Sequence, residues 1–311
     1  MNAPKVSIGL PVWNGDKYLR LALDSILQQD YTDFELIISD NASTDRTQEI
    51  CQEFAAKDKR IRYSRNQTNI GSSGNYNRVF ELARGQFFKW ASHDDEIHTS
   101  LLRRCLESFE HSAPNTVLVF SKAEIIDGSG RALRLSEDTI DQTAHETFTR
   151  LASLIFHRHY AHPLWGLIRS EALRRTRLMG GTEADHVLLA ELALQGPFVE
   201  IPEILYRQRR HAGSAMEVHR SARELLAWHD PSRAKVRFLL PRWIRWDVEY
   251  WKGIRFASLS RFDRLLCYAV ILGVPLWRWL LKVTGPLRQR LGLRWRTRQM
   301  VGEPDTSVPA E

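Results

Sequence analysis

The sequence has few cysteines and no hydrophobic run long enough to suggest a membrane span. Its 311 residues include only 3 cysteines, which are far apart: Cys51, Cys105 and Cys267. An odd number of cysteines without metal-like spacing argues against a disulfide framework or a zinc site and suits a reducing compartment. The first residues also lack the apolar stretch of a secretory signal. We therefore expect a cytoplasmic protein.

The usual phosphate-binding loops and internal repeats are also missing. The segment 69–75, NIGSSGN, is rich in glycine and amide side chains, but it is neither a Walker loop nor a G-x-G-x-x-G turn. It precedes an expected helix, and helix N-termini attract anions through free N–H groups and the helix dipole. An ordinary capped turn explains this segment equally well.

Basic residues and tryptophans are concentrated toward the C-terminus. The chain carries a net charge of +7, but residues 232–300 alone hold 16 Lys and Arg against 3 Asp and Glu. Seven of the 10 tryptophans lie at or beyond Trp228. This shift in composition predicts three parts: a main domain over 1–228, a basic helical extension over 229–300 and a flexible tail over 301–311.

Short apolar runs alternate with stretches of helical periodicity in the main domain. We expect strands near 6–10, 34–38, 61–63, 87–91, 117–120 and 164–168, and helices near 19–27, 43–57, 74–83, 99–110 and 183–194. Residues 127–130, DGSG, predict a hairpin turn. Strands that alternate with helices form βαβ units. The pattern therefore predicts an α/β fold with a mixed, mainly parallel sheet flanked by helices.

Carboxylates follow two of the expected strands. Asp94 and Asp95 come directly after the apolar run 87–92, and Asp40 follows the second strand. Because ligands bind beyond the carboxyl ends of strands in open α/β sheets, we expect these side chains to share one edge. Mg²⁺ prefers such oxygen ligands and often joins them to substrate phosphates. The alternatives are a solvated, helix-capping loop for the pair and an Asx-turn for Asp40.

Each of the other candidate residues is only a weak indication of function on its own. Asp185 at the start of a periodic helix suits a general base, although a carboxylate there also stabilises the first helical turn. Arg210 and His211 close the basic stretch 207–211, which suits a diphosphate but also a solvated loop. We interpret the histidines at 157, 159 and 162 as acceptor-site or surface residues rather than metal ligands.

Taken in order, these pieces resemble the family 2 glycosyltransferases. Residues 6–14, VSIGLPVWN, are similar to the family's first strand and its P-V-Y-N turn, and residues 40–45, DNASTD, to its D-D/N-x-S-x-D stretch. The segments 69–71, 83–85 and 94–95, with Asn75, follow in the family's order. The similarity covers residues 1–215, and the ordered combination is more specific than any single motif.

The resemblance implies a GT-A fold with a helical C-terminal extension, a nucleotide-sugar donor, Mg²⁺ or Mn²⁺, and inversion at the anomeric carbon. We expect a UDP-sugar as donor and a hydroxyl of a sugar, glycolipid or polysaccharide as acceptor, in cell-surface polysaccharide or glycolipid synthesis. The residues 1–228 would then be the catalytic domain.

The resemblance also implies a role for each candidate residue. Asp185 is expected to be the catalytic base, Arg210 and His211 to contact the diphosphate, and Asp94 and Asp95 to bind the metal. The nucleotide would be bound by Pro11, Val12, Asn14, Asp40, Asn69, Gly71, Asn75 and Asp94. The chain departs from the family at Ser92, because the D-x-D-D motif usually begins with Asp. This leaves open whether Asp94 alone holds the metal or whether Asp95 or His93 helps.

The basic extension lies outside the resemblance. Its run 265–277 has no charged residue but is shorter than the roughly 20 residues of a span. Tryptophans and arginines around 264–298 suit a helix at the lipid headgroups, which predicts a peripheral position at the inner face of a membrane. The alternative is a helical subdomain packed on the main domain.

Two other functions compete with sugar transfer. A basic segment with aromatic residues could bind nucleic acid, although the acidic main domain makes that partner unlikely in our interpretation. The serine at position 92 also leaves open a catalytically silent sugar-nucleotide-binding protein.

Overall fold

The structure, a computed structural model, describes residues 3–136, 143–156, 161–180, 184–214, 218, 221–233 and 241–274. Residues 1–270 form one compact unit and residues 271–311 a second. The first unit therefore includes residues 229–270, the beginning of the predicted extension. The predicted tail, residues 275–300, His157 and His159 lie outside the described residues.

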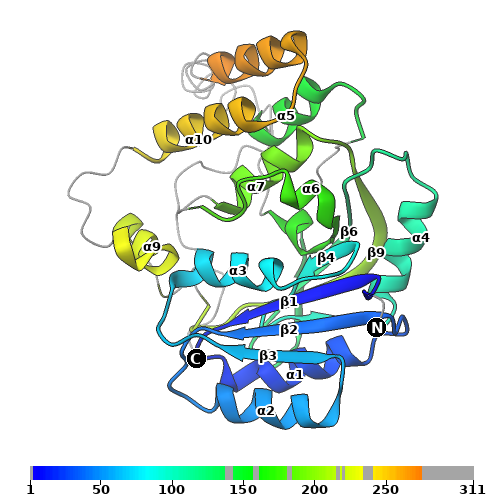
Figure 1. Ribbon diagram of the computed structural model, residues 1–311, viewed down its shortest axis with the longest axis vertical. Helices are drawn as coiled ribbons and strands as arrows, with labels where there is room; N and C mark the ends of the chain where they lie inside the picture. The colour runs from blue at the N-terminus through cyan, green and yellow to red at the C-terminus, as the bar shows by residue number, and fades with distance from the viewer. Residues whose placement is uncertain are drawn as a thin grey trace. The chain divides into compact units, whose positions relative to one another are not determined.

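A mixed sheet forms the centre of the first unit (Figure 1). Its strands are β1 (Val6–Val12), β2 (Phe34–Asp40), β3 (Ile61–Arg65), β4 (Phe87–Trp90), β5 (Glu96–Ile97), β6 (Leu118–Ile126), β7 (Ala132–Leu135), β8 (Leu167–Arg169) and β9 (Phe198–Arg209). Among the described residues the order is β3-β2-β1-β4-β8-β6-β9-β5, with β7 paired to β6. The pairs β1–β2, β1–β4, β2–β3 and β6–β9 are parallel and the others antiparallel. The predicted mixed, mainly parallel α/β sheet is confirmed.

Helices cover both faces of this sheet, as Figure 1 shows for α1 and α2 on one face and α3 on the other. The helices are α1 (Asp16–Leu27), α2 (Thr47–Lys57), α3 (Gly71–Glu81), α4 (Leu101–Glu110), α5 (Thr147–Phe156), α6 (Ser170–Arg174), α7 (Ala184–Ala193), α9 (Ala222–His229) and α10 (Arg242–Phe256), with short 3₁₀ turns η1 (His162–Trp165) and η2 (Pro231–Arg233).

Successive side chains of a strand point to opposite faces, so each strand supplies two cores. Leu36 and Ile38 of β2 join the core under α1, α2 and α4, whereas Ile37 joins the core under α3, α6 and α7. Both faces of β1 are buried along its whole length. The continuous apolar runs of the sequence are therefore explained by a sheet covered on both sides.

The close approach of α3 to β1 depends on Gly9. A Cβ atom at this position would lie 2.6 Å from Phe88 Cζ and 2.7 Å from Val79 Cγ2. Because real Cβ atoms do not approach other atoms so closely, a larger residue here would push α3 away from the strand. The first strand thus keeps α3, and the loop before it, against the edge where β1 ends.

The long strand β9 was not predicted from the sequence. It pairs with β6 in parallel, and the register shifts between Ser121 and Ala123, opposite the stretch that contains Pro202. Proline cannot donate to the ladder, and a bulge accommodates it. The predicted turn at 127–130 is confirmed: it joins β6 to β7, and Gly130 has a φ of +89°.

The helices after residue 220 pack on the main fold within the first unit. α9 begins with a capping box between Ser221 and Glu224. Arg177 binds both Glu191 of α7 and Glu249 of α10, at 2.5 and 2.8 Å. None of the helices in the described part of the chain has the length and apolar content needed to cross a bilayer.

Candidate active site

The predicted acidic residues meet at the carboxyl edge of the parallel strands. Asp40 is the last residue of β2 and lies opposite Val12 of β1, and Asp94 follows the end of β4 by four residues. The ring of His93 lies so close to the start of α1 that a Cβ on Gly15 would be 2.5 Å from it. The loops after β2 and β4 therefore bring Asp40 and Asp94 to one side of the sheet, as the sequence predicted.

Asp40 is fully buried and already bonded by its own fold. Its carboxylate accepts hydrogen bonds from the Ser43 N–H at 2.8 Å, the Tyr63 hydroxyl at 3.0 Å and Arg65 Nη1 at 2.6 Å. A carboxylate has about four acceptor positions, and these bonds take three of them. Burial and the Asp40 charge raise the pKa of Tyr63, which keeps that phenol protonated as a donor.

Asparagine side chains form a hydrogen-bonded network beside Asp40. Asn41 Nδ2 donates to Asn69 Oδ1 at 2.9 Å, and Asn66 Nδ2 donates to Asn41 Oδ1 at 3.0 Å and Asn75 Oδ1 at 3.1 Å. Asn75 is 2% exposed and returns a bond to the Ser39 carbonyl at 2.8 Å. The predicted nucleotide residues Asn69 and Asn75 thus hold the loop before α3 against β2.

The other predicted nucleotide residues line the same edge. Pro11 and Val12 are buried, and the Val12 carbonyl accepts from the Asn41 N–H at 2.8 Å. Asn14 is exposed with a left-handed φ of 50°, and its Oδ1 accepts from the Thr44 N–H at 2.8 Å. Of these three residues, only Asn14 has a side chain that is exposed to solvent.

Asp94 and His211 form a carboxylate–imidazole pair. Asp94 Oδ2 and His211 Nε2 are 3.1 Å apart, and each side chain is 13% exposed. Ser92 donates its hydroxyl to the other carboxylate oxygen. Burial alone would raise the pKa of Asp94, but the His211 bond, the His93 charge and the Ser92 bond hold it well below its usual range. Asp94 is therefore the acidic group that stays ionised in this site.

Asp95 points the other way, toward β9. Its Oδ1 accepts from the Arg209 N–H at 2.8 Å, and its Oδ2 accepts from the Tyr206 hydroxyl. Burial and the nearby Asp94 charge raise the pKa of Asp95 to about 8. Both oxygens are taken by a strand that the sequence did not reveal. This arrangement favours a structural role for Asp95 over the predicted metal-binding role.

The residues around Asp94 fit a divalent cation with few protein ligands. A carboxylate and an imidazole are both suitable ligands for Mn²⁺, and such ions commonly keep water or substrate phosphates in their remaining positions. Asp94 and His211 already converge, and both side chains are partly exposed. Within the described residues, no group of three or more acidic, histidine or cysteine side chains could hold a metal by itself. A substrate diphosphate would have to complete this set.

Asp185 lies in the first turn of α7. Its charge acts on Tyr76 of α3, as do the charges of Asp94 and Asp95. Burial, Asp94, Asp95 and Asp185 all raise the pKa of Tyr76. The three carboxylates therefore act on one phenol. The Asp185 Oδ1 accepts from the His186 N–H at 2.9 Å, and its second oxygen has no hydrogen-bond donor among the described residues.

The predicted diphosphate residues have different surroundings. Arg210 is half-buried, and its charge acts on Asp95 and on the buried His162, whose pKa burial and Arg210 lower to about 4. The neighbouring Arg209 is 3% exposed and holds the Asp94 carbonyl through Nε at 2.9 Å. Arg209 is thus a structural clamp, and Arg210 and His211 remain the groups available to a ligand.

Several residues of the site were missed from the sequence. The ring centroids of Tyr18 of α1 and His211 are 4.7 Å apart, and the Arg209 guanidinium lies 4.9 Å from the centroid of the Tyr18 ring. Tyr206 stacks on Trp165 at 5.9 Å. Beneath them, fully buried Lys89 donates to the Trp165 carbonyl, and burial lowers its pKa to about 8. A lysine in the middle of an apolar strand was the one available signal.

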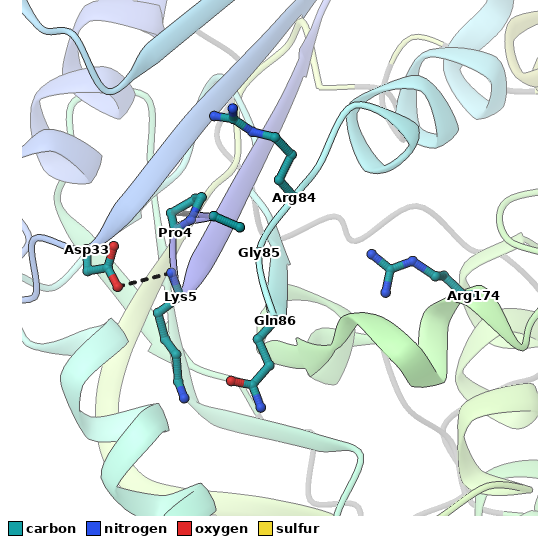
Figure 2. Close-up of a pocket in the computed structure, with 8 residues that line it drawn as sticks. Pro4, Lys5, Asp33, Arg84, Gly85, Gln86 and Arg174 are labelled. Carbon is teal, nitrogen blue, oxygen red and sulfur yellow. Dashed lines mark hydrogen bonds between the residues drawn. The ribbon is translucent and has the colours of Figure 1, made fainter. Parts of the chain in front are cut away.

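A separate cavity of about 340 Å³ lies at the opposite edge, where β1, β2 and β4 begin. Figure 2 shows Lys5, Arg84 and Arg174 around it, and the Lys5 N–H bonds Asp33 at 3.2 Å. None of the predicted site residues lines this cavity. The candidate active site at the carboxyl edge is therefore separate from this cavity.

The mainly parallel sheet, helices on both faces and acidic loops at the carboxyl edge define a GT-A-like glycosyltransferase fold. A model described as Glycosyl transferase family 2 matches residues 7–177. The chain belongs to glycosyltransferase family 2.

Known relatives are similar over part of their length. A GalNAc(5)-diNAcBac-PP-undecaprenol beta-1,3-glucosyltransferase of Campylobacter jejuni is 33% identical over 120 residues, which are 37% of this chain and 39% of that protein. The chain spans less than half of this and two other curated relatives, at 39%, 40% and 47% of their lengths.

Two solved structures share the fold over most of both chains. S. aureus TarS 1-349 in complex with UDP-GlcNAc has a TM-score of 0.56 at 17% identity, covering 94% of this chain and 93% of that one. The mannosyltransferase PcManGT from Pyrobaculum calidifontis, in complex with GDP-Man and Mn²⁺, has a TM-score of 0.50 at 14% identity, covering 96% and 89%.

Proposed function

We propose that this protein is an inverting, metal-dependent glycosyltransferase that moves a sugar from a UDP-sugar to a hydroxyl acceptor. The observation that carries the proposal is the partly exposed pair of Asp94 and His211 at the edge of the sheet that also holds the buried Asp40, where this kind of fold binds ligands. A TarS structure with UDP-GlcNAc and a mannosyltransferase structure with Mn²⁺ share the fold.

The donor would lie along the carboxyl edge of β2, β1 and β4. The free acceptor position of Asp40 suits the N3–H of uracil, with Asn14 and the backbone of Pro11 and Val12 around the ring. Asp94 and His211 would hold Mg²⁺ or Mn²⁺, which neutralises charge on the diphosphate when bound. Arg210 would add a fixed positive charge for the leaving group.

Asp185 would act as the general base. The acceptor hydroxyl gives its proton to the Asp185 carboxylate as its oxygen bonds to the anomeric carbon, and the bond from that carbon to the diphosphate oxygen breaks. The leaving nucleoside diphosphate carries the electron pair away, and the configuration inverts in one displacement. No covalent enzyme intermediate is needed.

The acceptor we propose is a hydroxyl of a sugar on a glycolipid or polysaccharide. The similar Campylobacter enzyme is named for a polyprenyl-diphosphate-linked acceptor. A lipid-linked acceptor is consistent with a peripheral position at the inner face of a membrane, in cell-surface polysaccharide or glycolipid synthesis.

Transfer and hydrolysis of a panel of UDP-sugars, with and without Mn²⁺, test this function. Asp94→Asn should lower turnover by about 10²–10³-fold and weaken metal-dependent UDP binding. Asp185→Asn should lower turnover by about 10²–10⁴-fold and leave UDP binding intact. Asp24→Asn changes an exposed aspartate of α1 and serves as the matched control.

The same experiment separates the competing functions. Metal-dependent UDP binding without turnover on any acceptor would favour a silent sugar-nucleotide-binding protein. Salt-sensitive capture of RNA or DNA without any response to UDP would favour a nucleic-acid-binding protein. Full turnover by Asp94→Asn would contradict the proposed site.

A further inference from the structure

The end of the first unit is an antiparallel helical hairpin. α10 turns at residues 257–260 into a helix over 261–270. The rings of Trp251 and Tyr268 stack across the two helices with centroids 4.1 Å apart. Arg264 Nη2 donates to the Ala257 carbonyl at 3.0 Å, and Ser260 Oγ accepts from the Asp263 N–H at 3.0 Å. The turn is therefore fixed by its own bonds.

One side of this hairpin is buried, and its tip carries exposed apolar side chains. Tyr250, Ile254 and Cys267 are at most 5% exposed. By contrast, Phe256, Phe262 and Leu265 are 55%, 70% and 68% exposed. Single exposed apolar residues are common, but three large ones at one tip mark a surface that binds another apolar phase.

Positive charge surrounds these apolar side chains. Arg255 and Arg261 are exposed and form no ion pair with the described residues. The nearest acids are engaged: Asp263 accepts from Ser260 at 2.6 Å, and Glu249 binds Lys252 and Arg177. A tip with phenyl and leucyl groups beside unpaired guanidiniums has the chemistry of an interfacial membrane contact.

A second copy of the chain fits this tip poorly. In a two-fold pairing the same surface meets itself, so the positive charges of two tips would be brought together, and the tip has no carboxylate left over to offset the repulsion. The sequence over 275–300 holds three tryptophans, six arginines, one lysine and no acidic residue. Anionic lipid provides both the apolar phase and the opposite charge.

We propose that the hairpin tip docks on an anionic bilayer, with Phe256, Phe262 and Leu265 entering the headgroup region and Arg255 and Arg261 binding lipid phosphates. This inference rests on the proposed function, because it names the surface that would bring the active site to a lipid-linked acceptor. The proposal places the membrane contact around the turn of the hairpin. These residues precede most of the basic stretch, 264–298, that the sequence indicated.

Sedimentation of the full-length protein with phosphatidylcholine vesicles, with and without 30% phosphatidylglycerol, tests the proposal. The unmodified protein should bind the anionic vesicles at least about tenfold more tightly, because clustered basic residues are attracted to anionic lipid. Phe262→Ser with Leu265→Ser should lower that binding about tenfold or more, since the apolar side chains no longer enter the interface. Arg255→Glu with Arg261→Glu should abolish the preference for anionic vesicles.

The matched control replaces two leucines that are also exposed but lie elsewhere. Leu133 and Leu135 of β7 are 45% and 53% exposed, and their double serine variant should bind vesicles as the unmodified protein does. Equal loss in both serine variants, or no loss in the hairpin variant, would overturn the proposal. So would a change in oligomeric mass of the hairpin variant without vesicle binding by the unmodified protein, which would indicate self-association.

Turnover of UDP-sugars, measured in the absence of vesicles, keeps the two proposals separate. Donor turnover without vesicle binding would refute the hairpin contact and leave the proposed function standing. Vesicle binding that requires Phe262 and Leu265, without turnover of any donor, would support the hairpin contact and refute the function.

Discussion

Asp94 and Asp95 are adjacent, yet they have opposite surroundings. Asp94 meets the imidazole of His211 at an accessible site, whereas Asp95 is sealed between a backbone N–H and the hydroxyl of Tyr206. The chain bends at residues 93 and 94 before β5 begins, and the two carboxylates have separate partners, His211 for Asp94 and β9 for Asp95. Asp94 is therefore the proposed metal ligand, and Asp95 is the residue that holds their shared loop against β9.

Tyr206→Phe tests the structural role of Asp95. The change removes one of the two donors to a buried carboxylate and keeps the ring that stacks on Trp165. We expect the free energy of unfolding to fall by about 1–3 kcal/mol in urea titrations. Tyr31→Phe is the control, because the Tyr31 hydroxyl has no hydrogen bond within the described structure. An equal loss in both variants would contradict this role for Tyr206.

Glu35 predicts how stability depends on pH. It is buried at the start of β2 and accepts hydrogen bonds from Ser7 at 2.7 Å, Arg62 at 2.8 Å and Arg84 at 2.7 Å. Burial alone would raise the pKa of Glu35, but the Arg84, Ser7 and Arg62 bonds lower it below the usual 4.5. The unfolded chain therefore takes up the proton first as the pH falls, and stability present above that value is lost as the pH falls through the folded pKa.

Glu35→Gln should lower the free energy of unfolding at pH 7 by about 1–3 kcal/mol, because the bonds to the two arginines lose their charge. Urea titrations between pH 7 and pH 3 should show the two proteins converging as the carboxylate is protonated. If the two free energies of unfolding differ by the same amount from pH 7 to pH 3, the ionised carboxylate adds no stability of its own. Glu49→Gln, at an exposed ion pair with Arg46, should leave the midpoint unchanged.

At the scale of elements, the strands that are apolar runs could be predicted from the sequence and β9 could not. β1, β2 and β4 are buried along their whole length, so their apolar composition alone marks them as strands. β9 contains Pro202, two glutamates and two arginines before its end, and it is held by pairing with β6 about 80 positions earlier. The residues that pair with β9 are distant in sequence, so no local sequence pattern indicates the pairing.

The same difference decides which site residues were predictable. Asp40 and Asp94 were placed correctly at one edge because strand ends are a local feature. The role of Asp95 depends on Tyr206, 111 residues away, and that of Asn75 on an amide network with Asn66. The sequence could offer candidate side chains at this edge, but only the packing shows which of them are already bonded.

The loop before α3 is fixed by a glycine that cannot be replaced. Gly71 has a φ of +81°, and a Cβ there would lie 2.4 Å from the His229 carbonyl oxygen of α9. Gly71→Ala should therefore lower the free energy of unfolding by about 1–3 kcal/mol, through backbone strain and displacement of α9. Gly74→Ala, one turn later in the same helix, meets only the flexible Ile70 side chain at 3.3 Å. It should be neutral or stabilising by up to about 1 kcal/mol.

Proteolysis adds a local measurement to the thermal midpoints of these two variants. If α9 is held against α3 through Gly71, Gly71→Ala should expose the segment around His229 to cleavage sooner than Gly74→Ala does. Identical midpoints and cleavage rates in the two variants would show that the close contact with His229 does not hold α9.

At the scale of the molecule, the edge where the strands begin and the edge where they end have different roles. The edge where the strands begin is tied by Glu35 and its arginines and is expected to contribute stability. The edge where they end collects Asp40, Asp94 and His211, and it keeps an accessible carboxylate–imidazole pair that gains full coordination only with a ligand. A donor that binds this second edge should therefore stabilise the whole unit.

Ligand binding to the folded state raises stability by an amount set by concentration and affinity. At 100 times its dissociation constant a ligand adds about 2.7 kcal/mol, and for a unit of this size each kcal/mol shifts the midpoint by about 2–4 °C. UDP with Mn²⁺ should raise the thermal midpoint by about 5–10 °C, and a chelator should remove most of the gain. Asp94→Asn should respond to UDP almost equally with and without the metal, because the charged one of the two proposed metal ligands is lost. GDP or ADP should give a smaller shift if Asp40 reads the N3–H of uracil, so an equal shift with all three nucleotides would rule out that contact while leaving the metal pair in place.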